Sequence, residues 1–268
     1  MLRGPEDLHR LVVELVEDSA ADGAVWTEVS VSASGFHRRL TGSDEATMEL
    51  VCDAVAVADG QAGVVIGIDR SRDAEQPGAL AGLAATWAGR GVVGLGLAGD
   101  ERASCAPFAR AAQIARDAGL QVVPHSGELR GPDSIREVLT VLRPNRLMHG
   151  VRAAEDPALV AELADRGVCL DLCPTSNVAL GVVARLAEHP LPGLVRSGVS
   201  CSLNADNTLV FSTDLADEYR IAREALGLTD NEIATLARAS LTASAAPAVV
   251  VAAGVAGIDD WLELHPGS

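Results

Sequence analysis

The chain has 268 residues, with 21 basic and 37 acidic side chains, which give a formal charge of −16. All of the basic residues are arginines, because the sequence contains no lysine. This excludes lysine Schiff bases and lysine-dependent phosphate loops. The acidic balance argues against nucleic acid and anionic membrane surfaces as partners, because both attract basic proteins.

The first residues lack the apolar segment of a secretory signal, and the longest nearly apolar stretch, 245–257, is too short to span a bilayer. Five scattered cysteines without a Cys-x-x-Cys pair indicate reduced thiols, and neither a disulfide framework nor a thiolate zinc site. We therefore expect a cytoplasmic protein without membrane segments. The sequence leaves its oligomeric state open.

Short apolar runs alternate with longer helical runs, and this repeat predicts a β/α protein. The expected strands are residues 25–31, 63–68, 91–97, 121–124, 146–149, 168–172 and 199–203. The expected helices are residues 6–20, 44–58, 78–88, 107–118, 133–142, 156–165, 184–197, 213–226, 230–244 and 247–256. The strands are continuous apolar runs, which is typical of parallel strands buried on both faces. Since no change in composition marks a linker, we expect one domain over residues 1–268.

The number of strands bears on the fold. Seven strands precede the helical C-terminal part, and the chain opens with a helix instead of a strand. A (β/α)8 barrel needs eight strands to close. The pattern therefore predicts an incomplete (β/α)8 TIM barrel that lacks its first strand. An open, doubly wound sheet of seven strands is the structural alternative.

Reactive side chains follow four successive strands, at the strand ends where chemistry gathers in both folds. They are His125 and Glu128, then His149, then Cys173, Ser176 and Asn177, and finally Asp206 and Asn207. Imidazole and carboxylate suit zinc or a similar metal, and a further His and Glu could supply the acid and base for metal-assisted hydrolysis. Polar residues also end strands without any function, but four successive strands with this set favour a site. We expect Cys173, Ser176 and Asn177 to shape its rim.

Ordered motifs along the chain resemble those of the adenosine deaminase family. They are Gly96-Leu-Ala-Gly-Asp-Glu101, His125-Ser-Gly-Glu128, Arg146-Leu-Met-His149-Gly, Cys173-Pro-Thr-Ser-Asn177 and Ser202-Leu-Asn-Ala-Asp206. The spacings of 3, 21 and 57 residues from His125 to Glu128, His149 and Asp206 fit the family pattern. The resemblance extends from about residue 6 to the C-terminal helices, which is essentially the whole chain.

The resemblance implies a zinc-dependent (β/α)8 hydrolase that replaces the 6-amino group of an adenine ring with oxygen. Its ligand would be a small purine nucleoside or base. By the resemblance, His125 and Asp206 would be ligands of Zn²⁺. Glu128 would donate a proton to ring N1, and His149 would orient the attacking hydroxide.

The same resemblance implies two substrate-binding residues. The backbone N–H of Gly99 would approach ring N3, because a residue without Cβ permits a close approach. Asn207 occupies the position where many members carry an aspartate that faces ring N7. An amide can still donate a hydrogen bond to N7, so we expect this departure to be tolerated.

One departure from the family pattern is larger. The family has a His-x-His motif at the end of its first strand, and no such motif occurs in this sequence. His37, which follows the first expected strand, is a candidate that could reach the rim. We therefore expect a truncated or naturally shortened chain that binds zinc weakly and deaminates poorly or not at all.

Two other functions stay open at this point. The first is a catalytically dead paralogue that binds a purine or serves as a subunit. The second is a metal-dependent amidohydrolase that acts on a ring other than a purine. The sequence does not distinguish adenosine, deoxyadenosine, adenine and aminodeoxyfutalosine as substrates.

Overall fold

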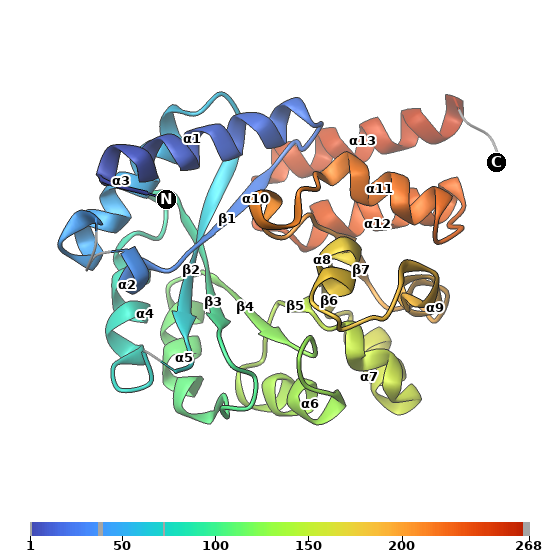
Figure 1. Ribbon diagram of the computed structural model, residues 1–268, viewed down its shortest axis with the longest axis horizontal. Helices are drawn as coiled ribbons and strands as arrows, with labels where there is room; N and C mark the ends of the chain where they lie inside the picture. Colours follow the sequence, from blue (N-terminus) through green and yellow to red (C-terminus); the bar gives the residue numbers. More distant parts are fainter. Residues whose placement is uncertain (1, 37–39, 72, 265–268) are drawn as a thin grey trace. The chain divides into compact units, whose positions relative to one another are not determined.

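The computed structural model in Figure 1 describes residues 2–36, 40–71 and 73–264. All seven predicted strands are present. They are β1(Thr27–Val31), β2(Ala62–Asp69), β3(Val92–Ala98), β4(Gln121–Ser126), β5(Arg146–His149), β6(Cys169–Leu172) and β7(Cys201–Leu203). Each begins and ends within two residues of its expected bounds.

The strands pair in the order β1-β2-β3-β4-β5-β6-β7, and every pairing is parallel. This sequential order is that of a (β/α)8 barrel, whereas a doubly wound sheet reverses its strand order near the middle. The doubly wound alternative is therefore wrong. The described residues form seven strands, one fewer than a complete (β/α)8 barrel contains.

Helices follow most of the strands, as expected for a β/α repeat. They are α1(Pro5–Ala21), α2(Ala33–Phe36), α3(Asp44–Val57), α4(Pro77–Thr86), α5(Ala109–Asp117), α6(Pro132–Val141), α7(Pro157–Arg166), α8(Pro174–Ala179), α9(Leu191–Arg196), α10(Thr208–Phe211), α11(Leu215–Glu224), α12(Asp230–Ala243) and α13(Ala248–Leu264). Short 3₁₀ turns add η2(Ala106–Phe108), η3(Val151–Glu155) and η4(Leu186–Glu188).

Two helix predictions need correction. The single helix expected over 184–197 is divided into η4 and α9, because His189 is extended and Pro190 is the N-cap of α9. A proline disfavours the helical conformation of the residue before it, which explains the break. The last helix continues eight residues beyond the expected end at residue 256 and ends at Leu264.

The chain divides into two compact units, which we describe separately. The N-terminal unit comprises Met1–Pro124 and Glu137–Pro144, and the C-terminal unit comprises His125–Arg136 and Asn145–Ser268. The single domain expected over residues 1–268 stays a prediction.

In the N-terminal unit, β2 forms the centre of the core. Its six inner residues are buried, as expected for a strand that is covered on both faces. Helix α1 packs against α3. Its buried residues Leu8, Val12 and Val16 recur every four residues and so share one face of the helix.

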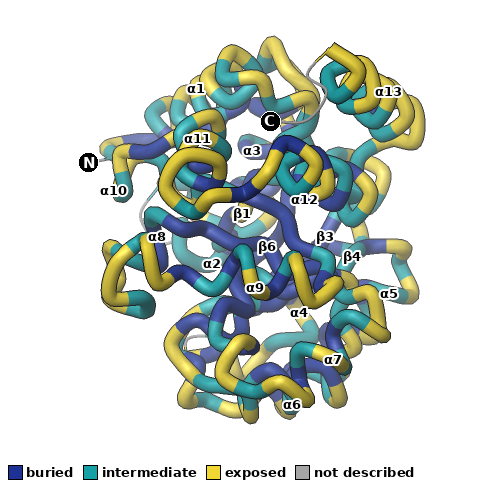
Figure 2. Tube along the Cα trace, turned by 90° about the vertical axis from the view of Figure 1, so that its right-hand side faces the viewer, coloured by how far each residue is buried: buried dark blue, intermediate teal, exposed yellow. Residues whose placement is uncertain are grey.

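In the C-terminal unit, all residues of β6 and β7 are buried, and α12 packs against both strands. Helix α12 begins with a capping box, in which the Thr229 hydroxyl and the Glu232 carboxylate each bond to the other residue's backbone N–H. Figure 2 shows the strands as mostly buried, whereas exposed residues gather on helices such as α7 and α13.

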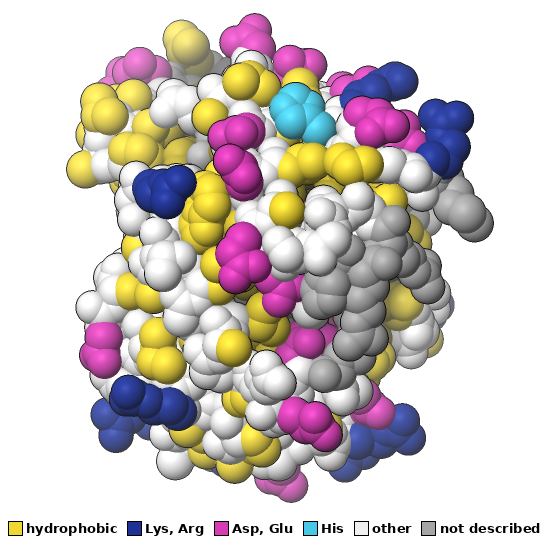
Figure 3. All heavy atoms as spheres, turned by 90° about the vertical axis from the view of Figure 1, so that its left-hand side faces the viewer, with side chains coloured by type: hydrophobic (Ala, Val, Ile, Leu, Met, Phe, Trp, Pro, Cys, Tyr) yellow, Lys and Arg dark blue, Asp and Glu magenta, His cyan; other side chains and the backbone are white. Residues whose placement is uncertain are grey.

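The surface carries many charged side chains. On the face drawn in Figure 3, acidic side chains are spread among apolar and uncharged ones instead of gathering in one area. Even α13, the most apolar of the long helices, is interrupted by Asp259 and Asp260. Within the described ranges, no helix combines the length and the apolar character that crossing a membrane requires.

Candidate functional site

The site in the C-terminal unit begins at the end of β4, where His125 lies in the strand and Glu128 follows it. Between them, Gly127 has a φ of +74°, and a Cβ added there would lie 2.4 Å from Cδ1 of Ile135. Because Ile135 is fully buried, this tight turn accepts only glycine. The turn directs the largely buried Glu128 toward the same end of the sheet as His125.

The next strand, β5, ends at His149. Its φ of +67° is left-handed, and Gly150 after it has a φ of +71°, so the backbone turns sharply where the strand stops. The Gly150 N–H donates to the Ser126 carbonyl at 2.9 Å and fixes this turn against β4. A left-handed conformation at a residue other than glycine stores strain of a kind that is frequent in functional sites.

His149 contacts both candidate residues of β4. Its Nε2 lies 3.6 Å from Oε1 of Glu128, which is longer than a hydrogen bond. The His125 and His149 ring centroids are 5.3 Å apart. Burial, with a smaller contribution from His125, lowers the pKa of His149 to about 3, so its imidazole is neutral near pH 7. Within the described part of the chain, no hydrogen-bond partner reaches its buried Nδ1.

Asp206 and Cys173 come from the two following strands. Asp206 lies three residues after β7, is exposed, and has a left-handed φ of +57°. The Ser176 hydroxyl donates a hydrogen bond to Oδ2 of Asp206 at 2.6 Å. Cys173 directly follows β6 and is buried, and its thiol makes a weak 3.7 Å contact with the Asp171 carbonyl oxygen. Burial raises the pKa of the Cys173 thiol well above its usual value, so the thiol is protonated in the apo protein.

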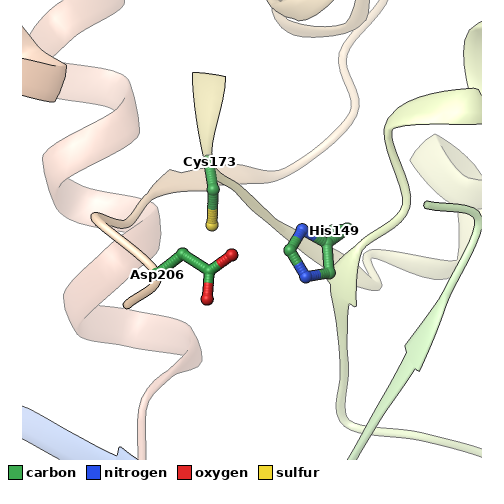
Figure 4. A group of neighbouring side chains, drawn as sticks. All are labelled: His149, Cys173 and Asp206. Atoms are coloured by element: carbon green, nitrogen blue, oxygen red, sulfur yellow. The ribbon is translucent and has the colours of Figure 1, made fainter. Parts of the chain in front are cut away.

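His149, Cys173 and Asp206 converge on one small space, as Figure 4 shows. Each offers one ligand atom, and these atoms all lie within 4.8 Å of one another. Imidazole nitrogen, cysteine sulfur and carboxylate oxygen are the ligand types that zinc prefers, and catalytic zinc sites use three protein ligands. The residues therefore fit a zinc ion, although His125, assigned by resemblance, is not part of this group.

Sequence reasoning placed His149 and Asp206 in the site but gave Cys173 no part in metal binding. The available signal was its position directly after a strand, next to two other strand ends with ligand side chains. What the sequence did not show is that the thiol points toward Asp206.

A buried pair supports α8, the short helix that carries Ser176. His189 Nδ1 accepts a hydrogen bond from the Leu191 N–H at 3.2 Å, so the ring proton is on Nε2 and is donated to Asn177 Oδ1, also at 3.2 Å. Burial lowers the pKa of His189 to about 4, which keeps this ring neutral. Ser176 and Asn177 are fully buried, so they act beneath the rim instead of on its surface.

The predicted substrate-binding residues lie in different units. Gly99 follows β3 in the N-terminal unit with a φ of +89°, and an added Cβ would lie 3.0 Å from Oδ1 of Asp69. Asn207, in the C-terminal unit, caps α10 by accepting the Val210 N–H on Oδ1 at 3.0 Å. The approach of either residue to a purine stays a prediction. His37 lies outside the described residues.

Beneath the site, Arg146 Nη1 lies 3.4 Å from Oδ2 of Asp171. The Ser202 hydroxyl donates to Oδ1 of the same carboxylate at 2.7 Å, and Asn204 donates to Ser202 at 2.9 Å. This buried network links β5, β6 and β7, and thus holds the three strands at whose ends His149, Cys173 and Asp206 lie.

Comparison with known sequences identifies the family. A family model described as adenosine deaminase matches residues 1–261. A Streptomyces coelicolor protein assigned as an adenosine/adenine deaminase is 46% identical over 266 residues, which cover 97% of this chain and 77% of the relative. An aminodeoxyfutalosine deaminase of Acidothermus cellulolyticus is 38% identical over 83% of this chain and 65% of its own length.

Solved structures agree with this similarity. The adenine deaminase of Arthrobacter aurescens superposes with a TM-score of 0.89 at 27% identity, covering 98% of this chain and 81% of that one. An amidohydrolase of Burkholderia ambifaria with bound zinc has a TM-score of 0.89 over 98% of this chain and 75% of its own, and its 22% identity supports the shared fold alone. The chain belongs to the adenosine deaminase family, whose motifs lie at the strand ends described above.

Proposed function

We propose that this protein hydrolytically removes the 6-amino group of a purine base or nucleoside. The observation that carries the proposal is the pairing of two buried groups at adjacent strand ends, Glu128 and His149, whose Oε1 and Nε2 atoms are 3.6 Å apart. A carboxyl group and a neutral imidazole at one point supply an acid and a base for proton transfers on a ring.

The two residues take different parts in the proposed reaction. Glu128, in its protonated form, donates to ring N1 and makes C6 more electrophilic. His149 is neutral because it is buried, so a ring nitrogen can accept a hydrogen bond from the attacking water and orient it. His125 and Asp206 are the metal ligands that the family resemblance implies. A zinc ion, when bound, would act as a Lewis acid and activate water near neutral pH.

An uncharged purine is the substrate class that this chain suits best. The net charge of −16 disfavours anionic ligands in the absence of a local basic site. The named relatives include deaminases of adenosine or adenine and of aminodeoxyfutalosine, and they supply the compounds to test.

The test measures ammonia release from adenine, adenosine, deoxyadenosine and aminodeoxyfutalosine by the zinc-supplemented protein. Glu128→Gln keeps the shape of the side chain and should lower turnover by roughly 10²–10⁴-fold, with metal content and Tm unchanged. Glu162→Gln, at a half-exposed ion pair on α7, is the matched control and should retain turnover. Equal turnover in the Glu128→Gln and parent proteins would overturn the proposal.

The same assay separates the open alternatives. A protein that binds purines without releasing ammonia is the dead paralogue, and one that hydrolyses only other rings is a different amidohydrolase. Low turnover that Glu128→Gln abolishes agrees with the predicted weak activity of a chain without a His-x-His motif.

A further inference from the structure

Glu218 is a fully buried acidic residue that the proposed reaction does not use. It lies in the first turn of α11, and its two oxygen atoms face two different segments of the C-terminal unit. The backbone N–H of Thr175 donates a hydrogen bond to Oε2 at 3.3 Å, and the Thr213 hydroxyl donates one to Oε1 at 3.2 Å. We propose that Glu218 is a positioning residue of the metal site, because it holds Ser176 against the carboxylate of Asp206.

The burial of Glu218 is unfavourable by itself, since a carboxylate loses its hydration when it is moved out of water. Among the described residues, no basic side chain forms an ion pair with it. Burial raises the pKa of Glu218 above its usual value, and hydrogen bonds from Thr175 and Thr213 oppose this shift. An apolar side chain could fill the same space without losing hydration, so we attribute the carboxyl group to the two hydrogen bonds that it accepts.

The first of these bonds acts on α8, the helix that carries Ser176. This helix has only six residues, and the side chain of its N-cap residue, Cys173, makes no capping hydrogen bond. A helix of this length is not stable alone, and the N–H groups of its first turn have no partners within the helix. Glu218 supplies such a partner from α11, at the residue directly before Ser176. The position of the Ser176 hydroxyl therefore depends on Glu218.

The second bond acts on the segment that follows Asp206. Helix α10 begins two residues after Asp206 and contacts α8, and Thr213 lies in the turn between α10 and α11. The Thr213 hydroxyl is closer to Glu218 than to its other possible acceptor, a backbone carbonyl oxygen at 3.5 Å. One carboxylate thus joins the two segments whose side chains meet in the 2.6 Å hydrogen bond between Ser176 and Asp206.

This arrangement affects the metal ion only indirectly. The proposal rests on the proposed function, in which His125 and Asp206 are the metal ligands. In the described part of the chain, Glu218 bonds to neither of them, so it acts through Ser176 instead of binding the ion. Groups that orient a metal ligand raise the affinity for the metal, because they fix the direction of the ligand before the ion arrives.

The test measures the zinc affinity of the full chain by titration against a competing chelator. Glu218→Ala removes both hydrogen bonds and should weaken zinc binding about tenfold, the lower end of the range for groups that orient a metal ligand. Glu218→Gln keeps an acceptor oxygen and should lose less affinity. Leu163→Ala, which removes a buried side chain from α7 of the same unit, is the control for general stability. It should lower Tm and keep the zinc affinity of the parent protein.

A double-mutant cycle with Ser176→Ala tests whether Glu218 acts through Ser176. If it does, Glu218→Ala should weaken zinc binding much less in the Ser176→Ala background than in the parent protein. Thr213→Val removes the hydroxyl and should weaken zinc binding, whereas Thr213→Ser keeps the hydroxyl and should retain the parent affinity. The two Thr213 variants test the proposal even if Glu218→Ala fails to fold, which far-ultraviolet circular dichroism would reveal.

Several results would overturn the proposal. They are a parent protein that binds no zinc, equal zinc affinities for the parent and a folded Glu218→Ala protein, and an undiminished effect of Glu218→Ala in the Ser176→Ala background. Equal affinities for the Thr213→Val and parent proteins, or an equally large loss in Leu163→Ala, would also overturn it. None of these results depends on turnover. A parent protein that binds zinc but releases no ammonia from any purine would contradict the proposed function alone.

Discussion

The hydroxyl of Ser176 donates a 2.6 Å hydrogen bond to Oδ2 of Asp206 and so connects helix α8 to the turn after β7. Ser176 is fully buried whereas Asp206 is exposed. The buried hydroxyl therefore fixes the direction of a carboxylate that water can reach. The bond allows an exposed carboxylate to keep one orientation in the site.

Ser176→Ala should therefore weaken metal binding by about 10–100-fold, because it frees the Asp206 carboxylate without removing it. The measurement is a zinc titration against a competing chelator. Ser19→Ala removes a hydroxyl hydrogen bond on helix α1 of the N-terminal unit and serves as the control. Equal zinc affinities for the Ser176→Ala and parent proteins would contradict the role given to this bond.

Gly127→Ala should destabilise the protein far more than Gly119→Ala does. Both glycines have left-handed φ values, +74° and +77°, so either substitution costs about 1–2 kcal/mol in backbone strain. A Cβ at Gly119 meets nothing within 4 Å, whereas one at Gly127 would overlap the side chain of Ile135. The overlap should add about 1–3 kcal/mol.

Urea unfolding of the two glycine variants measures this difference. Ile135→Val in the Gly127→Ala background should recover part of the lost stability, because it removes the nearer of the two overlapping carbon atoms. Similar losses for the two glycine variants would show that the turn relaxes and that the site tolerates a displaced Glu128.

Removing one partner of the Arg146–Asp171 pair should cost about 3–5 kcal/mol, because it leaves an uncompensated charge in the interior. Both side chains are only 9% exposed, and the ion pair measures 3.4 Å. Arg146→Leu combined with Asp171→Leu should cost less than the sum of the single changes. Arg185→Leu breaks an exposed pair with Glu188 and should cost less than about 1 kcal/mol.

Unfolding free energies of the single and double variants form the test. Strictly additive effects would mean that the buried network does not act as a unit.

Stability should fall as the pH decreases from about 6.5 to about 4, partly because of His189. Burial lowers its folded pKa to about 4, below the 6.5 of an unperturbed histidine, so the unfolded state binds more protons in this window. The stabilisation from the neutral His189 ring is complete above the unfolded pKa of 6.5 and is lost as the pH falls toward the folded pKa of about 4. Its full size is roughly 3 kcal/mol. His149 contributes in the same direction, since burial lowers its pKa too.

His189→Gln should flatten the dependence of unfolding free energy on pH. The part of this dependence that His149 contributes should remain. Leu191→Ala, which changes a buried residue in the same segment, should lower the whole curve without altering its slope. Parallel curves for the parent and His189→Gln proteins would mean that His189 keeps an ordinary pKa in the folded state.

Most of the fold could be predicted from the sequence because its strands are continuous apolar runs. All seven strands and most long helices lie within two residues of their expected bounds. The prediction of one helix over 184–197 was wrong, because the apolar spacing continues through Pro190 whereas the helical backbone is interrupted there. Short helices such as α8 and α10 contain too few residues to show a periodic pattern.

The candidate site was only partly accessible to sequence reasoning. Strand ends identified His149 and Asp206, since the strand order alone brings those ends together. The closeness of Cys173 to His149 and Asp206 depends on side-chain direction and on the left-handed backbone at Asp206, and neither leaves a sequence pattern. The pairing of Arg146 with Asp171, one of several possible partners, also required the pairing of β5 with β6.

His125 and Asp206 are separated by 81 residues along the chain and lie at the ends of two different strands, β4 and β7. An ion bound by both, as the family resemblance implies, would work as a cross-link between β4 and β7, present only in the folded chain. Its binding energy would then add to the folding energy of the C-terminal unit, by about 2.7 kcal/mol at a free ion concentration one hundred times Kd. Chelation would lower the melting temperature of that whole unit instead of loosening a single loop.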